Sequence, residues 1–272
     1  MARPKKHYGQ HFLHERGIVE RIVAAIAPQP GDRIVEIGPG EGALTLPLLD
    51  VAHTLTAIEL DAELIEPLRA AAQARGELTI IHADVLDVDF TALAGGGKLR
   101  LAGNLPYYVS SPILFHCLKH ARAISDMVFM LQKEVVDRMA APPGSKTYGR
   151  LSVMLQLACK VEPLLRVPPG AFRPPPQVDS AVVRLVPLAT PLDAQVDHAQ
   201  VEAIVRAAFG QRRKTLSNAL SGLLDADTIR AAGIDPRARA ETLSPQQYVG
   251  LARSADLQRS RILADNHCHD PS

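Results

Sequence analysis

Residues 104–107, Asn-Leu-Pro-Tyr, combine groups that could bind an amine attached to a flat ring. Pro106 disfavours a helical conformation at Leu105, so we expect the chain to stay extended there. The Asn104 amide oxygen and the Leu105 carbonyl oxygen could then face one point, with the Tyr107 ring beside them. Both oxygens accept N–H hydrogen bonds, and the ring can stack on a base. An amine held in this way keeps its lone pair on nitrogen and can attack an electrophile. The motif alone is weak evidence, because a strand that ends in a turn can have the same sequence.

A glycine-rich turn, Gly-Pro-Gly-Glu-Gly at residues 38–42, lies between an expected strand and a helical pattern. Glycines allow backbone N–H groups to approach a ligand closely. Glu59 ends the second expected strand, and Asp84 follows the third. An acidic side chain at the first of these positions suits ribose hydroxyls, and one at the second suits an adenine amine.

These strand ends are expected to meet in one crevice, because the carboxyl ends of parallel strands share one edge of a sheet. The glycine turn and the two acids fit either a dinucleotide or S-adenosylmethionine. The motif at Asn104 favours the second ligand, because methyl transfer to an amine needs an amine-binding site and hydride transfer does not. Glu36, before the turn, is a candidate contact for the methionine end. No metal is expected, because a sulfonium methyl group is already activated.

Strand and helix patterns alternate along the first part of the chain, which predicts an α/β fold with a parallel sheet and helices on both faces. The expected strands are residues 32–38, 53–60, 78–83, 99–102 and 127–131, with a closing pair at 164–167 and 178–186. Beyond residue 187 only helical patterns remain. We therefore predict a Rossmann-like domain with a basic N-terminal arm at 1–187, a small all-helical RNA-binding domain at 188–258, and a disordered tail at 259–272.

Prolines dominate residues 167–177, which predicts a stiff extended loop. The loop could be a rigid connector, or it could present Phe172 as a second stacking surface for a base. Two basic clusters are candidate contacts for RNA phosphates, although such clusters are often only solvated. They are Arg3, Lys5 and Lys6 in the arm, and Arg212, Arg213 and Lys214 at the start of a helix.

The composition restricts the cellular setting of the protein. The 272 residues carry a net charge of +1, so binding to a nucleic acid would depend on local basic patches. The three cysteines, Cys117, Cys159 and Cys268, have no metal-ligand spacing, which favours a reducing compartment. No signal-peptide pattern or long apolar run is present. We expect a cytoplasmic monomer that does not enter a membrane.

Several motifs taken together resemble the S-adenosylmethionine-dependent ribosomal RNA adenine dimethyltransferases, and in particular the subgroup that acts on bacterial 16S RNA. The resemblance covers roughly residues 7 to 255. Its motifs are Gly-Gln-His-Phe-Leu at 9–13, Glu-Ile-Gly-Pro-Gly-Glu-Gly-Ala-Leu-Thr at 36–45, Ile-Glu at 58–59, Ala-Asp at 83–84, Gly-Asn-Leu-Pro-Tyr-Tyr at 103–108, Phe-Arg-Pro-Pro-Pro-Gln-Val-Asp-Ser-Ala-Val-Val-Arg at 172–184, and Gln-Arg-Arg-Lys-Thr-Leu-Ser-Asn at 211–218.

The resemblance implies a reaction, a cofactor and a set of site residues. The reaction is the transfer of two methyl groups to N6 of each of two adjacent adenosines, in a hairpin near the 3′ end of the 16S RNA. The implied cofactor residues are His11, Leu13, Gly38, Glu59, Asp84 and Asn104, with Gly40, Leu60 and Val85 beside them. Many relatives have Asn where this chain has His11, and His adds a titratable group. The implied partner is 16S RNA within a 30S subunit or its precursor.

Three other functions are compatible with parts of the pattern. A 23S RNA dimethyltransferase that confers macrolide resistance would share the Asn-x-Pro-Tyr motif, but residues 211–216 and the size of the helical domain favour the 16S subgroup. A ribosome-assembly factor could act mainly by binding, and this role could coexist with methylation. A nicotinamide-dependent oxidoreductase would bind a dinucleotide at the glycine turn.

Overall fold

The structure, a computed structural model, describes residues 11–267, with side chains described as far as residue 258. The described chain divides into two compact units, which are residues 11–137 with 160–187, and residues 138–159 with 188–267.

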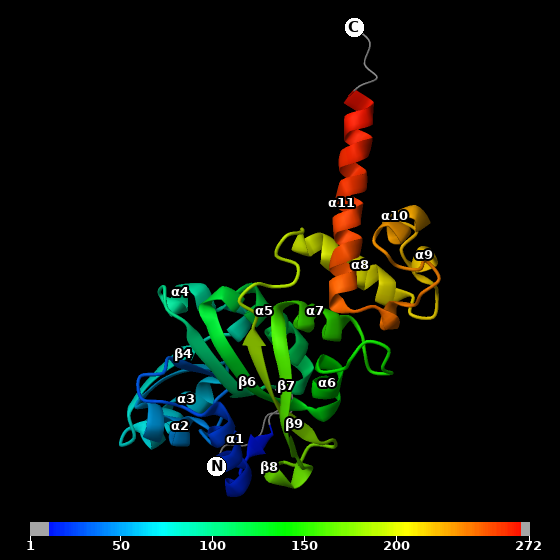
Figure 1. Cartoon of the computed structure of the whole chain (residues 1–272). Helices are drawn as coiled ribbons and strands as arrows, with labels where there is room; N and C mark the ends of the chain where they lie inside the picture. Colours follow the sequence, from blue (N-terminus) through cyan, green and yellow to red (C-terminus); the bar gives the residue numbers. More distant parts are fainter. Residues whose placement is uncertain (1–10, 268–272) are drawn as a thin grey trace. The chain divides into compact units, whose positions relative to one another are not determined.

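A seven-stranded sheet forms the centre of the first unit (Figure 1). Its strands are β2 (Ile34–Ile37), β3 (Thr54–Glu59), β4 (Glu77–His82), β5 (Leu99–Asn104), β6 (Ile124–Gln132), β7 (Cys159–Val167) and β9 (Ser180–Pro187). They lie in the order β4-β3-β2-β5-β6-β9-β7. Strands β2 to β6 pair in parallel, and β9 is antiparallel to β6. This arrangement confirms the predicted α/β class, including the closing strands at the edge.

Helices flank this sheet because one side of each is apolar. They are α1 (Arg16–Ile26), α2 (Thr45–Ala52), α3 (Ala62–Ala72), α4 (Phe90–Ala94) and α5 (Ser110–Lys119). In α1, Ile18, Ile22 and Ile26 recur every four residues and are all buried. In α3, the Asp61 side chain accepts a hydrogen bond from the backbone N–H of Glu63 and so caps the first turn.

The strand order reverses between β2 and β5. Strands β3 and β4 follow β2 on one side of it, and the next strand in the sequence, β5, lies on the other side of β2. Parallel α/β sheets bind ligands at the carboxyl ends of strands beside such a reversal. The two strands approach closely, since a Cβ atom at Gly103 would collide with the backbone carbonyl of Ile37. Glycine at this position brings Asn104 beside the glycine turn.

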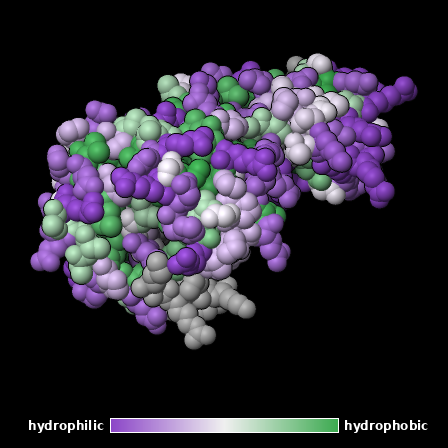
Figure 2. Space-filling model, turned by 90° about the horizontal axis from the view of Figure 1, so that it is seen from below, coloured by the Kyte–Doolittle hydropathy of each residue, from purple (hydrophilic) through white to green (hydrophobic). Residues whose placement is uncertain are grey.

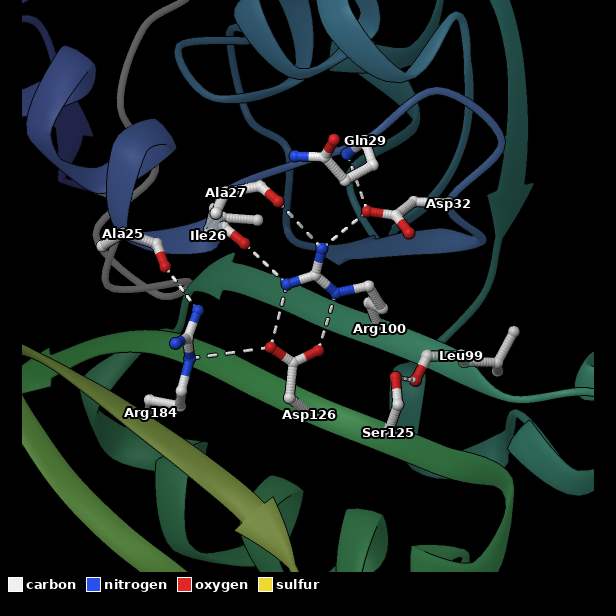
Figure 3. Close-up of polar contacts among 10 residues, drawn as sticks. All are labelled: Ala25, Ile26, Ala27, Gln29, Asp32, Leu99, Arg100, Ser125, Asp126 and Arg184. Atoms are coloured by element: carbon white, nitrogen blue, oxygen red, sulfur yellow. Dashed lines mark hydrogen bonds and ion pairs between the residues drawn. The ribbon is translucent and has the colours of Figure 1, made fainter.

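A cluster of charged side chains ties α1 to the sheet (Figure 3). Arg100 on β5 donates two hydrogen bonds to Asp126, at 2.8 and 2.9 Å, and one to Asp32 at 2.6 Å. It also donates to the Ile26 carbonyl at 2.6 Å, while Arg184 on β9 donates to a carbonyl one residue earlier in α1. These side chains are mostly buried, and the Asp126 carboxylate raises the pKa of Arg100. The cluster therefore satisfies the last carbonyls of α1 and holds the helix against three strands.

A separate two-stranded sheet joins the beginning of the described chain to the proline-rich loop. Strand β1 (Phe12–Leu13) pairs antiparallel with β8 (Phe172–Arg173), with Leu13 opposite Phe172. The sequence analysis did not predict this pairing. Its consequence is that residues 11–13 lie beside the carboxyl ends of the central strands.

The second unit is helical. It contains α7 (Arg150–Ala158), α8 (His198–Gly210), α9 (Leu216–Ala219), α10 (Ala226–Ala231) and α11 (Pro245–His267), while α6 (Lys133–Met139) spans the change from the first unit. Phe209 packs between Tyr148 and Tyr248, with ring centroids 6.1 and 6.0 Å away. A capping box begins α11, because Ser244 and Gln247 exchange side-chain to backbone hydrogen bonds.

Two features of this unit differ from the sequence-based expectation. Residues 138–159 belong to it, although they precede the expected start at 188. Helix α11 continues to His267, so residues 259–267 are helical where a disordered tail was expected. Within residues 11–267, no helix combines the length and apolarity that a membrane span requires. The face shown in Figure 2 is mainly hydrophilic, with apolar residues in small separate patches.

Candidate active site

A cavity opens at the carboxyl ends of the parallel strands, where the strand order reverses. Every residue assigned to the cofactor from the sequence lines it, together with the whole Asn-Leu-Pro-Tyr motif. The predicted residues brought together here are His11, Leu13, Gly38, Gly40, Glu59, Leu60, Asp84, Val85, Asn104, Leu105, Pro106 and Tyr107. They come from β1, the ends of β2, β3, β4 and β5, and the turns that follow. All belong to the first unit.

The glycine turn is held by the carboxylate of Glu59. One oxygen accepts a hydrogen bond from the Gly40 N–H at 3.2 Å, and the other accepts from the Asp61 N–H at 2.7 Å. Gly40 has a φ of +58°, and a Cβ atom there would lie 3.2 Å from the Phe12 ring, so both conformation and space favour glycine. Burial raises the pKa of Glu59, and these backbone donors partly offset that effect. Each carboxylate oxygen keeps a lone pair that could accept from a ligand hydroxyl.

Glu36 is a second buried acid in the cavity wall. Its side chain is 1% exposed, and Thr45 Oγ1 donates to it at 2.6 Å. Burial raises the pKa of Glu36 to about 7, and the nearby Glu59 adds to this effect. The proton is therefore retained to a much higher pH than on an exposed glutamate.

Asp84 caps the turn that follows β4. Its Oδ1 accepts from the backbone N–H of Leu86 at 2.9 Å, so the side chain has a defined orientation. The side chain is exposed toward the cavity that it lines, which leaves Oδ2 available to an amine donor. Leu60 and Val85 add apolar surface beside Asp84 in the same cavity.

The amide of Asn104 is oriented by the backbone of His11, the residue before β1. Its Nδ2 donates to the His11 carbonyl at 3.0 Å. The amide oxygen Oδ1 therefore points away from that carbonyl and can accept a hydrogen bond. Leu105 donates its N–H to the Met130 carbonyl at 3.1 Å, which holds this residue to β6. Pro106 has a φ of −59° and a ψ of 131°, so the chain is extended at this residue before the short turn that begins at Tyr107.

Tyr107 is fixed at both ends of its side chain. Its hydroxyl is 2.6 Å from Ser180 Oγ on β9, and its ring lies beside the His11 imidazole, with centroids 5.7 Å apart and planes inclined by 26°. The imidazole is itself anchored, since Nδ1 donates to the Pro174 carbonyl at 2.8 Å. Burial raises the pKa of Tyr107, so the phenol is neutral at physiological pH. Ser180 and the stacking role of His11 were not predicted from the sequence.

The expectation for Phe172 is corrected by the structure. The side chain is only 2% exposed and packs in the apolar core with Leu13, Ile18 and Val182, so it presents no face to a base. The cause is the pairing of β8 with β1, which places Phe172 on the core side of the small sheet. The ring beside Tyr107 is instead His11.

The two basic clusters have different outcomes. Arg3, Lys5 and Lys6 lie outside the described residues. Arg212, Arg213 and Lys214 are exposed in the second unit, before α9. Arg212 donates to the Lys146 carbonyl at 2.7 Å and lies 3.9 Å from the Glu241 carboxylate, so part of its role is structural.

Comparisons with known proteins identify the family of the chain. A family profile described as ribosomal RNA adenine dimethylase matches residues 1–256. The chain is 60% identical over 251 residues to Ribosomal RNA small subunit methyltransferase A of Xanthomonas campestris pv. campestris strain B100, covering 92% of this chain and 96% of the relative. It is 58% identical to the protein of the same name from Xylella fastidiosa strain 9a5c, covering 94% and 97%.

Two solved structures share the fold over nearly the whole chain. A dimethyladenosine transferase from Plasmodium falciparum superposes with a TM-score of 0.80 at 25% identity, covering 92% of this chain and 98% of that one. The 23S rRNA methyltransferase ErmE superposes with a TM-score of 0.70 at 27% identity, covering 90% and 99%. The resemblance seen in the sequence is thus confirmed, and the chain belongs to the ribosomal RNA adenine dimethylase family.

Proposed function

We propose that this protein transfers methyl groups from S-adenosylmethionine to N6 of two adjacent adenosines, in a hairpin near the 3′ end of 16S RNA. The product is N6,N6-dimethyladenosine, formed during maturation of the small ribosomal subunit. The observation that carries the proposal is the orientation of Asn104, whose amide oxygen is left as an acceptor at the reversal point of the sheet. The 60% identity to a small-subunit methyltransferase supports 16S RNA as the substrate over 23S RNA.

Acceptor groups and apolar side chains of the cavity support binding of S-adenosylmethionine. Carboxylate oxygens at Glu59 and Asp84 can accept from ribose hydroxyls and from the adenine amine. Leu60 and Val85 offer apolar contact to a flat ring, and the backbone of the glycine turn can approach closely. S-adenosylmethionine supplies an electrophilic methyl group when bound.

The chain acts on the target adenine by binding and orienting it. A base inside a stacked RNA cannot reach the cavity, so the target must be unstacked. Asn104 Oδ1 and the Leu105 carbonyl would accept its two N–H groups, and Tyr107 would stack on its ring. These contacts localise the lone pair on N6 and hold it in line for attack, and the amine proton can leave after the N–C bond forms. Positioning and exclusion of water then supply most of the rate.

Ser180 and His11 maintain this arrangement. Ser180 holds the Tyr107 hydroxyl, and the His11 carbonyl holds the Asn104 amide. We propose that Arg213 and Lys214 contact RNA phosphates. We also propose that the protein acts in the cytoplasm, as a monomer, on a 30S subunit or its precursor.

The direct test is methyl transfer from labelled S-adenosylmethionine to under-methylated 30S particles, followed by nucleoside analysis of the RNA. We expect N6,N6-dimethyladenosine at two adjacent positions of the 16S RNA. Label in 23S RNA of intact ribosomes but not in 16S RNA would replace the proposal with the 23S function. Absence of transfer to either RNA, by protein that binds S-adenosylmethionine, would refute it.

A further inference from the structure

Tyr108 is unusual among the aromatic side chains of this protein. It is 58% exposed, and it is the only Phe or Tyr classed as exposed within residues 11–258. The other aromatic side chains in this part of the chain are buried or half-buried. The Tyr108 side chain makes no hydrogen bond with the described residues. Folding therefore makes little use of this ring, which directs attention to what it could bind.

The exposed ring lies at the cavity. Tyr108 lines it and follows Tyr107 directly, in a short 3₁₀ turn from Tyr107 to Val109. A 3₁₀ helix has three residues per turn, so consecutive side chains point about 120° apart. Tyr107 is directed inward by Ser180, whereas Tyr108 projects to solvent at the rim.

The cavity that Tyr108 lines has other exposed apolar side chains. Two further large apolar side chains with substantial exposure line the same cavity, Leu60 at 44% and Leu86 at 37%. Single exposed apolar residues are common and need no explanation. Three of them line this one cavity, and Tyr108 alone among the three has a flat ring that could stack on a base.

We propose that Tyr108 stacks on the base next to the target adenine. This inference rests on the proposed function. Removing one base from an RNA stack exposes a face of its neighbour, which loses its stacking partner. An aromatic ring can replace that partner, because every base has a π-face. Tyr107 inside the cavity and Tyr108 at its rim would thus contact two consecutive bases, which matches a substrate with two adjacent adenosines.

The test compares Tyr108→Ala and Tyr108→Phe with the wild-type protein and with Leu164→Ala. Leu164 is a matched control, because it is 39% exposed on β7 and does not line the cavity. With 30S particles, we expect Tyr108→Ala to raise KM for the particle at least about fivefold, the low end of base–aromatic stacking. Its kcat and its affinity for S-adenosylmethionine should stay within about twofold of wild type. Tyr108→Phe, which keeps the ring, and Leu164→Ala should behave as wild type.

A modified RNA separates stacking from a structural role. In particles whose 16S RNA carries an abasic ribose at one of the two adenosines, the other adenosine is the only target and has lost its neighbour. We expect Tyr108→Ala and the wild type to have the same KM on this substrate. An equal loss on intact and abasic particles, no loss on intact particles, or a loss of S-adenosylmethionine affinity would overturn the proposal. Failure of the proposed function would look different, because the wild type would then not methylate intact particles.

Discussion

The buried acid Glu36 gives the protein a specific dependence of stability on pH. In the folded state its pKa is about 7, against 4.5 for an unperturbed glutamate. Between these values the folded protein keeps a proton that the unfolded chain has lost. The free energy of unfolding therefore falls as pH rises from about 4.5 to about 7, and it levels off above that range.

The size of this effect follows from the two pKa values. At about 1.4 kcal/mol per pKa unit, the difference corresponds to roughly 3 kcal/mol, most of which falls between pH 5 and pH 8. Glu36→Gln removes the titration and keeps an oxygen that can accept the hydrogen bond from Thr45. We expect this variant to have stability close to wild type at pH 5, and to be more stable by about 2–3 kcal/mol at pH 8.

Urea denaturation of both proteins at pH 5, 6, 7 and 8 measures this difference directly. The difference in free energy of unfolding between the two proteins is taken at each pH. Groups that titrate alike in both proteins then contribute little to this difference. The reasoning is refuted if the stability difference between Glu36→Gln and wild type stays constant within about 0.5 kcal/mol over this range. A difference with the opposite sign at pH 8 would show that the charged carboxylate stabilises the fold.

Three further predictions concern the cluster at α1, the tyrosine hydroxyl and the second unit. Arg100→Leu should lower the free energy of unfolding by about 3 kcal/mol, since it removes the ion-pair partner of Asp32 and leaves Asp126 with only Arg184, at 3.6 Å. Arg16→Leu should cost less than about 1 kcal/mol because its ion pair is exposed. Ser180→Ala should lower kcat in wild type but have no further effect in Tyr107→Phe, as a double-mutant cycle of methyl transfer would show. Neutralising residues 212–214 should weaken RNA binding and reduce its salt dependence without changing S-adenosylmethionine affinity, as salt titrations would measure; an equal loss of both affinities would indicate a structural role.

Much of the site could be predicted because its signals are local. Asn104 ends β5, and Pro106 two residues later is extended, so the end of the strand could be recognised from the motif itself. The alternation of strands and helices places Gly38, Glu59 and Asp84 at one edge of a parallel sheet, whatever the details of packing. Glu36, which precedes the glycine turn, was also predicted as a contact for the methionine end of the cofactor.

The features that were missed depend on contacts between distant residues. The burial of Phe172 depends on its register with Leu13, which no short window of sequence encodes. Ser180 looks like one more residue of an apolar strand, and only the folded chain brings it to the Tyr107 hydroxyl, 73 positions away. His11 was predicted as a cofactor contact, and nothing in the sequence indicated that its carbonyl would also bind the Asn104 amide or that its ring would lie beside Tyr107.

The central claim concerns the acceptor at Asn104, and Asn104→Ala tests it most directly. The measurement is the single-turnover rate of methyl transfer to 30S particles at saturating S-adenosylmethionine, so that any change in cofactor affinity does not contribute. Loss of one oriented polar contact to a reacting group typically costs about 100-fold or more in rate. We predict a fall of about that size with the fold unchanged by circular dichroism. A rate within about threefold of wild type would contradict the account, because the amide oxygen would then have no part in positioning the amine.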